Sequence, residues 1–158
     1  MAEENTPQIE RQFSIQKIYV KDVSFETPNS PQIFTQGWEP KVDFNLSSSA
    51  QQLQDEVFEV SLTVTVTVKV EDKTAYLVEI TQSGIFSASG FPNEEMGHLL
   101  GSYCPNLLFP YAREAVSDLV GKGGFPPMLL APVNFDALYA QHLQQRGDAA
   151  GQPATRSH

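Results

Sequence analysis

Apolar and polar side chains alternate most regularly between residues 57 and 70. Every even position from Phe58 to Val70 is apolar, whereas the odd positions carry Glu, Ser, Thr or Lys. Successive side chains of a β-strand point to opposite faces, so a period of two indicates a strand with one buried face and one wet face. At about 3.3 Å per residue the predicted strand is roughly 45 Å long.

Weaker alternation predicts three more strands. The first covers residues 13–25, where the period slips by one residue twice, which indicates one or two β-bulges. The second covers residues 38–46 and is followed by a polar segment, residues 47–54, that we expect to be a loop. The last follows a tight turn and covers residues 74–86.

The segment between the first two strands, residues 27–37, is longer than an ordinary hairpin loop of two to five residues. Its Pro28, Asn29, Pro31 and Gly37 mark it as a loop. We therefore expect this segment to cross between strands that are distant in the sheet.

Three helices are predicted beyond the strands, over residues 93–100, 110–120 and 135–146. Asn93 and Asn134 are the expected N-caps of the first and third. Pro105 and Pro110 are expected to break the chain before the second, with Pro110 in its first turn. Residues 125–133 contain three prolines and are expected to be extended.

Strands followed by helices are typical of an α+β fold, in which helices pack on one face of an antiparallel sheet. The length of 158 residues fits one domain. We expect that domain over residues 13–146, between a disordered N-terminal segment (1–12) and a flexible C-terminal tail (147–158).

The helix predicted over residues 110–120 has an apolar arc about 180° wide, whereas a helix lying on a sheet needs only about 100°. Tyr111, Ala115 and Leu119 lie on this arc. The extra width predicts a second apolar neighbour. We expect a second subunit, because few helices are available to cover so long a sheet.

The balance of charge is acidic, with 19 acids, 10 bases and a formal charge of −9. A nucleic-acid partner is not expected, because phosphate contacts need clustered Lys and Arg, and an anionic membrane surface is disfavoured for the same reason. The first residues lack a secretory signal pattern and no apolar run is long enough to span a bilayer. We therefore expect a cytoplasmic protein that does not insert into a membrane.

Catalytic and metal-binding motifs are absent from the sequence. The three histidines, His98, His142 and His158, do not have metal-ligand spacing, and Cys104 is the only cysteine. No cofactor or metal is therefore expected. An α+β enzyme that binds a small molecule and uses Cys104 or His98 stays open as an alternative.

Several segments resemble the SecB protein-export chaperones. They read IYVKDVSFETPN (18–29), GIFS (84–87), GSYCPNLLFPYARE (101–114) and APVNFDALY (131–139). The resemblance is colinear from about residue 12 to about residue 145.

The resemblance implies a four-stranded antiparallel sheet of order 1-4-3-2 with helices on one face, assembled as a homotetramer that is a dimer of dimers. It implies no catalysis. Such chaperones hold unfolded preproteins in the cytosol without ATP, keep them competent for translocation and deliver them to the SecA motor. A second possibility within the family is a SecB-like chaperone dedicated to a toxin–antitoxin pair.

The resemblance also implies three groups of functional residues. A client-binding groove is expected around the loop after the first strand, with Ile33, Phe34, Trp38, Phe44 and Phe86. The SecA contact is expected at Asp22, Glu26, Leu77 and Glu79, of which the alternation places Leu77 and Glu79 on the wet face. Positions linked to assembly are Val78, Ile80 and Gln82, which join Tyr111, Ala115 and Leu119 from the helix arc.

Overall fold

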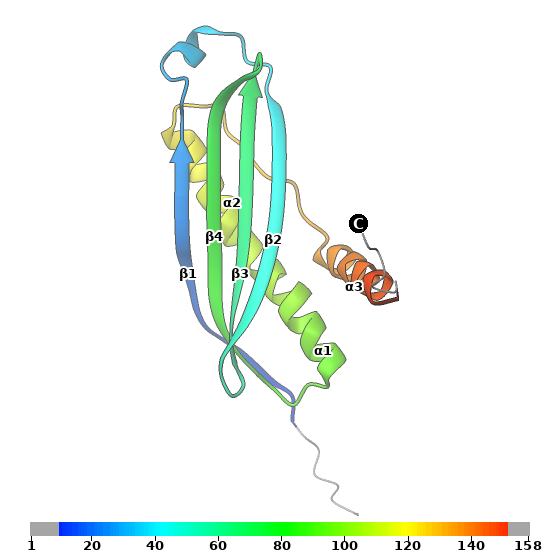
Figure 1. Cartoon of the computed structure of the whole chain (residues 1–158). Coiled ribbons are helices and arrows are strands. Elements are labelled where there is room, and N and C mark those ends of the chain that lie inside the picture. Colours follow the sequence, from blue (N-terminus) through cyan, green and yellow to red (C-terminus); the bar gives the residue numbers. More distant parts are fainter. Residues whose placement is uncertain (1–9, 152–158) are drawn as a thin grey trace, which may run out of the picture.

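Four long strands form one antiparallel sheet of order β1-β4-β3-β2 in the computed structural model, which describes residues 10–151, with side chains to residue 147 (Figure 1). The strands are β1 (Gln12–Glu26), β2 (Lys41–Gln54), β3 (Val57–Val70) and β4 (Lys73–Ser89). The expected strand order is confirmed. Residues 1–9 and 152–158, most of the predicted N-terminal segment and half of the predicted tail, lie outside the described residues.

Strand β1 contains the two irregularities that its sequence predicts. Its register against β4 shifts between Ile15 and Lys17 and again between Val20 and Asp22. Because β1 and β2 lie at opposite edges of the sheet, the chain between them crosses the whole sheet end, as expected. This crossing loop contains a 3-10 helix, η1 (Gln32–Thr35), which buries Ile33.

Strand β2 does not end where the sequence suggested. Residues 47–54, predicted as a loop, continue the strand and pair with β3, for example Ser47 with Thr63 and Gln52 with Phe58. This prediction was wrong because β2 is an edge strand whose polar side chains are exposed on both faces. Its backbone hydrogen bonds to β3 hold it in place without an apolar period.

Alternate residues of the sheet face two different environments. The even positions of β3 from Val60 to Val70 are buried, and so are Tyr76, Val78 and Ile80 of β4. The odd positions face the other side. The hairpin between β3 and β4 turns at Glu71 and Asp72, both with positive φ (50° and 65°), as a tight two-residue hairpin requires.

The first and second predicted helices are continuous, and the second begins earlier than predicted. Helix α1 (Asn93–His98) leads through a π-helical turn, η2 (Leu99–Tyr103), into α2 (Cys104–Lys122). Pro92, not Asn93, is at the N-cap position of α1, and no side chain caps it.

The predicted break at the two prolines was also wrong. Pro105 lies at the start of α2, directly after the π-helical turn, and Pro110 lies inside the helix. An internal proline costs about 3 kcal/mol. The burial of Leu108, Phe109 and Ala112 against the rest of the core offsets that cost.

Helix α2 lies across one face of the sheet and contacts β3 and β4 (Figure 1). After it the chain is extended from Phe125 to Val133, as expected, and enters α3 (Phe135–Gly151). The predicted cap is confirmed, since Asn134 Oδ1 accepts a hydrogen bond from the Ala137 amide at 3.0 Å. Helix α3 continues to Gly151, beyond the predicted end at residue 146.

Helix α3 contacts the rest of the protein mainly at the π-helical turn. A Cβ atom on either Gly97 or Gly101 would come within 2.6 Å of the Tyr139 side chain, so both glycines are needed for the close approach of α3. Asp136 accepts hydrogen bonds from Ser102 (2.5 Å) and His98 (2.8 Å). No helix within residues 10–151 is long and apolar enough to cross a membrane.

Candidate functional site

Three aromatic side chains cluster where the crossing loop meets the chain that follows α2. The ring centroids of Phe34 and Trp38 lie 5.0 Å and 5.8 Å from that of Phe125. Phe125 in turn packs on Tyr76 of the core at 4.9 Å. Phe34 and Trp38 remain 50% and 37% exposed. We call Phe34, Trp38 and Phe125 the aromatic cluster; its Phe125 ring is buried, and its Phe34 and Trp38 rings are partly open to solvent.

Phe125 was not predicted as a site residue, because its segment was expected only to be extended. The backbone explains its position. Helix α2 ends at Gly123 and Gly124, and Gly124 has a φ of +86°, which turns the chain back over the sheet. Two glycines followed by an aromatic residue are the only signal of this turn in the sequence.

The other residues expected in the groove are not all at the surface. Phe44 is 37% exposed on β2, on the same side of the sheet as α2. Ile33 and Phe86 are buried. Phe86 stacks on Phe13, ten residues along β4 from Tyr76, a distance of about 33 Å along the strand. The structure therefore brings Phe34 and Trp38 together and leaves Phe86 in a distant part of the core.

The apolar face of the sheet extends beyond α2 at the β1 edge. Ile15, Val20 and Val23 pair with Phe86, Gln82 and Ile80, so they face the helix side, yet they are 46–49% exposed. Such a row of apolar side chains beside an edge strand is typical of a surface that another chain covers.

The residues expected at the subunit interface fall into two sets. Tyr111 of α2 is 50% exposed, and Ala115 and Leu119 are partly buried beside it. Val78, Ile80 and Gln82 are buried in the protomer and pair with β1. Any effect of these three on assembly must therefore be indirect, through the surface residues that they support.

The opposite face of the sheet brings the expected SecA-contact residues together. Glu26 pairs with Leu77, Ser24 with Glu79, and Asp22 with Thr81. Residues paired in an antiparallel register share a face, so Asp22, Glu26, Leu77 and Glu79 form one patch, which we call the acidic surface. Among the described residues, none of its three carboxylates makes an ion pair.

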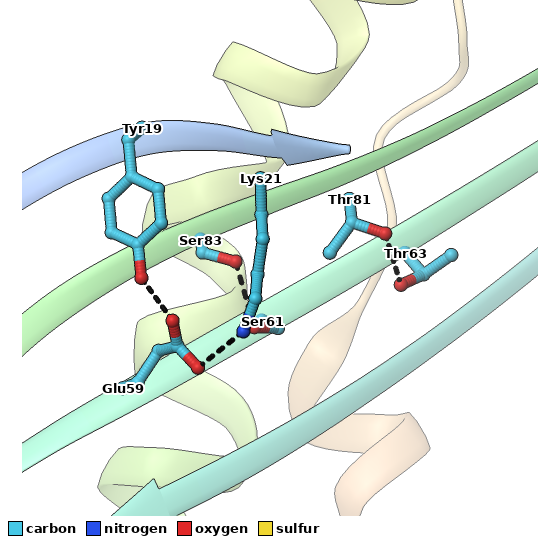
Figure 2. A network of polar contacts seen from close by, with 7 residues as sticks. All are labelled: Tyr19, Lys21, Glu59, Ser61, Thr63, Thr81 and Ser83. Carbon is cyan, nitrogen blue, oxygen red and sulfur yellow. Dashed lines mark hydrogen bonds and ion pairs between the residues drawn. The ribbon is translucent and has the colours of Figure 1, made fainter. Parts of the chain in front are cut away.

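A network of polar contacts lies on the same face, further along the strands (Figure 2). The Tyr19 hydroxyl donates to one oxygen of Glu59, and Lys21 Nζ donates to the other at 2.9 Å. Nearby, the hydroxyl pairs Ser61–Ser83 and Thr63–Thr81 are 2.8 Å and 3.1 Å apart.

The network perturbs two of its titratable groups. The hydrogen bonds from Tyr19 and Lys21 lower the pKa of Glu59, which keeps it ionised. Burial, together with the hydrogen bond to Glu59 and its charge, raises the pKa of Tyr19 to about 12. This network was not predicted from the sequence, because Tyr19 and Glu59 become neighbours only through the strand order and the bulge at Lys21.

The residues proposed for an enzyme are not arranged for catalysis. Cys104 is buried in the core, and burial raises the pKa of its thiol to about 12, so the reactive thiolate is absent at neutral pH. His98 is bound to Asp136 instead of Cys104. Within the described part of the chain no group of His, Cys, Asp and Glu could hold a metal ion.

Exposed aromatic rings and an acidic surface without ion pairs are typical of a protein that binds other proteins. The family model described as "Preprotein translocase subunit SecB" matches residues 5–146. The chain is 74% identical over 155 residues to the protein-export protein SecB of Methylococcus capsulatus, covering 98% of this chain and 99% of the relative. It is 59% identical over 157 residues to the protein-export protein SecB of Nitrosococcus oceani, covering 94% of this chain and 96% of the relative. The chain belongs to the SecB family of protein-export chaperones, and it is not an enzyme.

One solved structure bears on the second possibility within the family. A SecB-like chaperone of Mycobacterium tuberculosis in complex with a ChAD peptide from the HigA1 antitoxin has a TM-score of 0.64 and 18% identity, over 77% of this chain and 90% of that one. At this identity the likeness shows the fold alone. The close relatives are protein-export proteins, so neither the antitoxin alternative nor the enzyme alternative has support.

Proposed function

We propose that this chaperone holds unfolded preproteins on the helix side of its sheet and presents the opposite side to SecA. The protein works without ATP, in the cytoplasm, as a homotetramer. The observation that carries the proposal is the pair of exposed rings, Phe34 and Trp38, packed on the buried Phe125.

The aromatic cluster suits a client without a fixed sequence. Phe125 holds Phe34 and Trp38 from one side, so a client side chain can cover the open side of these rings without rearranging the core. Burial of apolar area is not directional, so many sequences gain similar free energy from the same surface. Phe44 extends the apolar surface along β2.

A tetramer can bind one client at several sites at once, so individually weak contacts give a high overall affinity. Four copies of the cluster act on one flexible client, so each additional contact is made at a high effective concentration. The exposed row Ile15, Val20 and Val23 at the β1 edge and the Tyr111 side of α2 are the surfaces that the subunit contacts cover. Their burial supplies the apolar area that a stable interface needs.

The acidic surface suits a basic partner. Asp22, Glu26 and Glu79 surround the partly exposed Leu77, and their charges are not neutralised by ion pairs within residues 10–147. The resemblance gives SecA a basic tail as the contacting segment. Complementary charge speeds such an encounter and fixes its orientation.

The test is suppression of aggregation of a denatured, slow-folding preprotein by the purified protein in the absence of ATP. We expect full suppression at a stoichiometric ratio, and we expect Phe34→Ser combined with Trp38→Ser to weaken it. A matched double variant on the polar face, Ser47→Ala with Ser49→Ala, should behave like the unaltered protein. Equal suppression by all three proteins would show that clients bind elsewhere.

A further inference from the structure

The ion pair between Lys21 and Glu59 joins two strands that are not neighbours. Lys21 lies on β1 and Glu59 on β3, with β4 between them. Strands are about 4.8 Å apart, so the two side chains must span twice that distance. Tyr19 makes the same crossing to the other oxygen of Glu59 (Figure 2).

The crossing passes over β4 beside Ile85, the residue that pairs with Glu59, and its other side is made of small side chains. Tyr19 pairs with Ser83 of β4, and Ser83 pairs with Ser61 of β3. The two serine hydroxyls bond to each other at 2.8 Å, and Ser83 is buried. Larger residues here would block the path of Tyr19 and Lys21 over β4.

The bulge in β1 gives Lys21 its place on this face. The register shifts between Val20 and Asp22, so Lys21 is the extra residue that has no partner on β4. Asp22 pairs with Thr81 on the polar face, and Lys21 reaches Glu59 on that same face. Consecutive residues Lys21 and Asp22 therefore share one face, which an undistorted strand does not allow.

Asp22 and Glu59 are alternative ion-pair partners for Lys21. Lys21 is next to Asp22 in sequence and on the same face, and its flexible stem makes it a candidate to neutralise that carboxylate. In the structure its Nζ instead binds Glu59 at 2.9 Å. Asp22 stays exposed and without an ion-pair partner among the described residues.

We propose that Glu59 is a positioning residue for the acidic surface: it holds Lys21 across β4 and so keeps Asp22 available to a basic partner. Glu59 itself does not touch the partner, since it lies along the strands from Glu26 and Glu79 and its side chain is only 13% exposed. The inference rests on the proposed contact with SecA at the acidic surface.

The geometry makes Glu59 a firmer partner for Lys21 than Asp22 could be. Its two oxygens receive different donors, Tyr19 on one and Lys21 on the other, so the carboxylate is fixed before Lys21 binds. Its environment is also less exposed to water, and ion pairs with little exposure are less screened by salt. The lowered pKa of Glu59 keeps its charge over the whole neutral range.

A double-mutant cycle tests this role, with the affinity of the full-length protein for purified SecA measured by calorimetry at low ionic strength. Glu59→Gln keeps an acceptor for Tyr19 but releases Lys21, and we expect roughly threefold to tenfold weaker binding. Lys21→Gln alone should change the affinity less than about twofold. The combination of both should restore the affinity nearly to that of the unaltered protein.

Restored SecA affinity in the double variant would distinguish a positioning role of Glu59 from a simple loss of its negative charge. If Glu59 acted only through its distant charge, Lys21→Gln would strengthen binding equally with and without Glu59, and that additive result would overturn the inference. Glu79→Lys is measured in parallel. If it weakens SecA binding while the cycle is additive, the proposed function stands and the inference fails; if Glu79→Lys has no effect, both fail.

Tyrosine NMR supplies a readout that is independent of SecA. In Glu59→Gln the pKa of Tyr19 should fall from about 12 towards its ordinary value, because one cause of the increase is removed. An unchanged Tyr19 signal would mean that the contact does not form in solution and would overturn the inference. The thermal unfolding midpoint of each variant verifies that the sheet is intact.

Discussion

The two faces of the sheet differ in chemistry although they alternate along the same strands. On the helix side, β3 contributes only apolar side chains from Val60 to Val70, and all of them are buried. On the other side the same strand contributes Glu59, Ser61 and Thr63, which bond to side chains of other strands. A single residue step therefore separates the closed apolar core from a face that offers charges and hydroxyl groups. In the function proposed above, clients bind on the helix side of the sheet and SecA on the other, so the two partners do not compete for one face.

The largest predicted effect is on the free energy of unfolding, when Val and Thr, which have the same shape, are substituted for each other on the two faces of β3. Val64→Thr places a hydroxyl in the closed core, and we expect the free energy of unfolding to fall by about 2 kcal/mol. Thr63→Val removes a hydroxyl from the polar face, where water can replace the bond to Thr81, and should cost about 0.5 kcal/mol. Urea unfolding of both variants gives the difference. Equal decreases in the free energy of unfolding would mean that the two faces tolerate such a substitution equally well.

A charge reversal on the acidic surface should separate the two binding activities. Glu79→Lys should weaken SecA binding about tenfold at low ionic strength, which is about 1.4 kcal/mol, and leave client binding unchanged. The effect should shrink as salt is added, because exposed charges are screened. Glu94→Lys carries the same change of charge onto α1, away from the surface, and is the control. Isothermal calorimetry with SecA and with a denatured preprotein measures both affinities.

Removal of one exposed ring of the aromatic cluster should have the opposite selectivity and weaken client binding only. Phe34→Ala deletes the open half of the aromatic cluster but leaves Phe125 on Tyr76, so we expect client affinity to fall about threefold to fivefold. SecA affinity should be unchanged. Fluorescence anisotropy with a labelled unfolded preprotein is a suitable measurement. A loss of SecA binding in this variant would indicate that the two faces are coupled.

The smallest predicted effect is the pH dependence of the contact between Tyr19 and Glu59, which should be confined to the polar face. The folded pKa of Glu59 is lowered, so its contribution is present above the ordinary pKa of Glu and is lost as pH falls through the lowered value. The folded pKa of Tyr19 is raised to about 12, so its contribution is present below pH 10 and is lost as pH rises towards 12. Chemical shifts of Tyr19 should change at both limits. Signals of Val64 and Val66 in the core should not change before the protein unfolds.

The sequence predicted those parts of the fold in which side-chain chemistry and backbone position agree. The period of β3 fixes its two faces, and the slips near Ile15 and Val20 correspond to the bulges of β1. The extension of β2 through Ser47 was not predictable from periodicity, because main-chain bonds at an edge leave no pattern in side chains. Pro110 was misread as a helix break, since the packing of α2 outweighs the local penalty.

The site was predictable to the extent that it lies on regular strands. Leu77 and Glu79 were placed on the correct face by alternation alone, and the structure adds Asp22 and Glu26 to the same patch through the register of β1 and β4. Phe125 and Glu59 were missed because their roles depend on tertiary neighbours, Tyr76 in one case and Tyr19 in the other. Phe86 is buried far from the crossing loop, because β4 is long and Phe86 lies near its other end.

The strand order has a consequence for how the chain is made. Gln12 pairs with Ser89, so the first strand to leave the ribosome finds its neighbour only after the last strand has been synthesised. Strands β2, β3 and β4 form a meander of local contacts and can assemble first, whereas β1 must wait and close a long loop. During synthesis the apolar side of β1 is therefore exposed in the same way as a client segment. This chaperone passes through the state that it protects in other proteins.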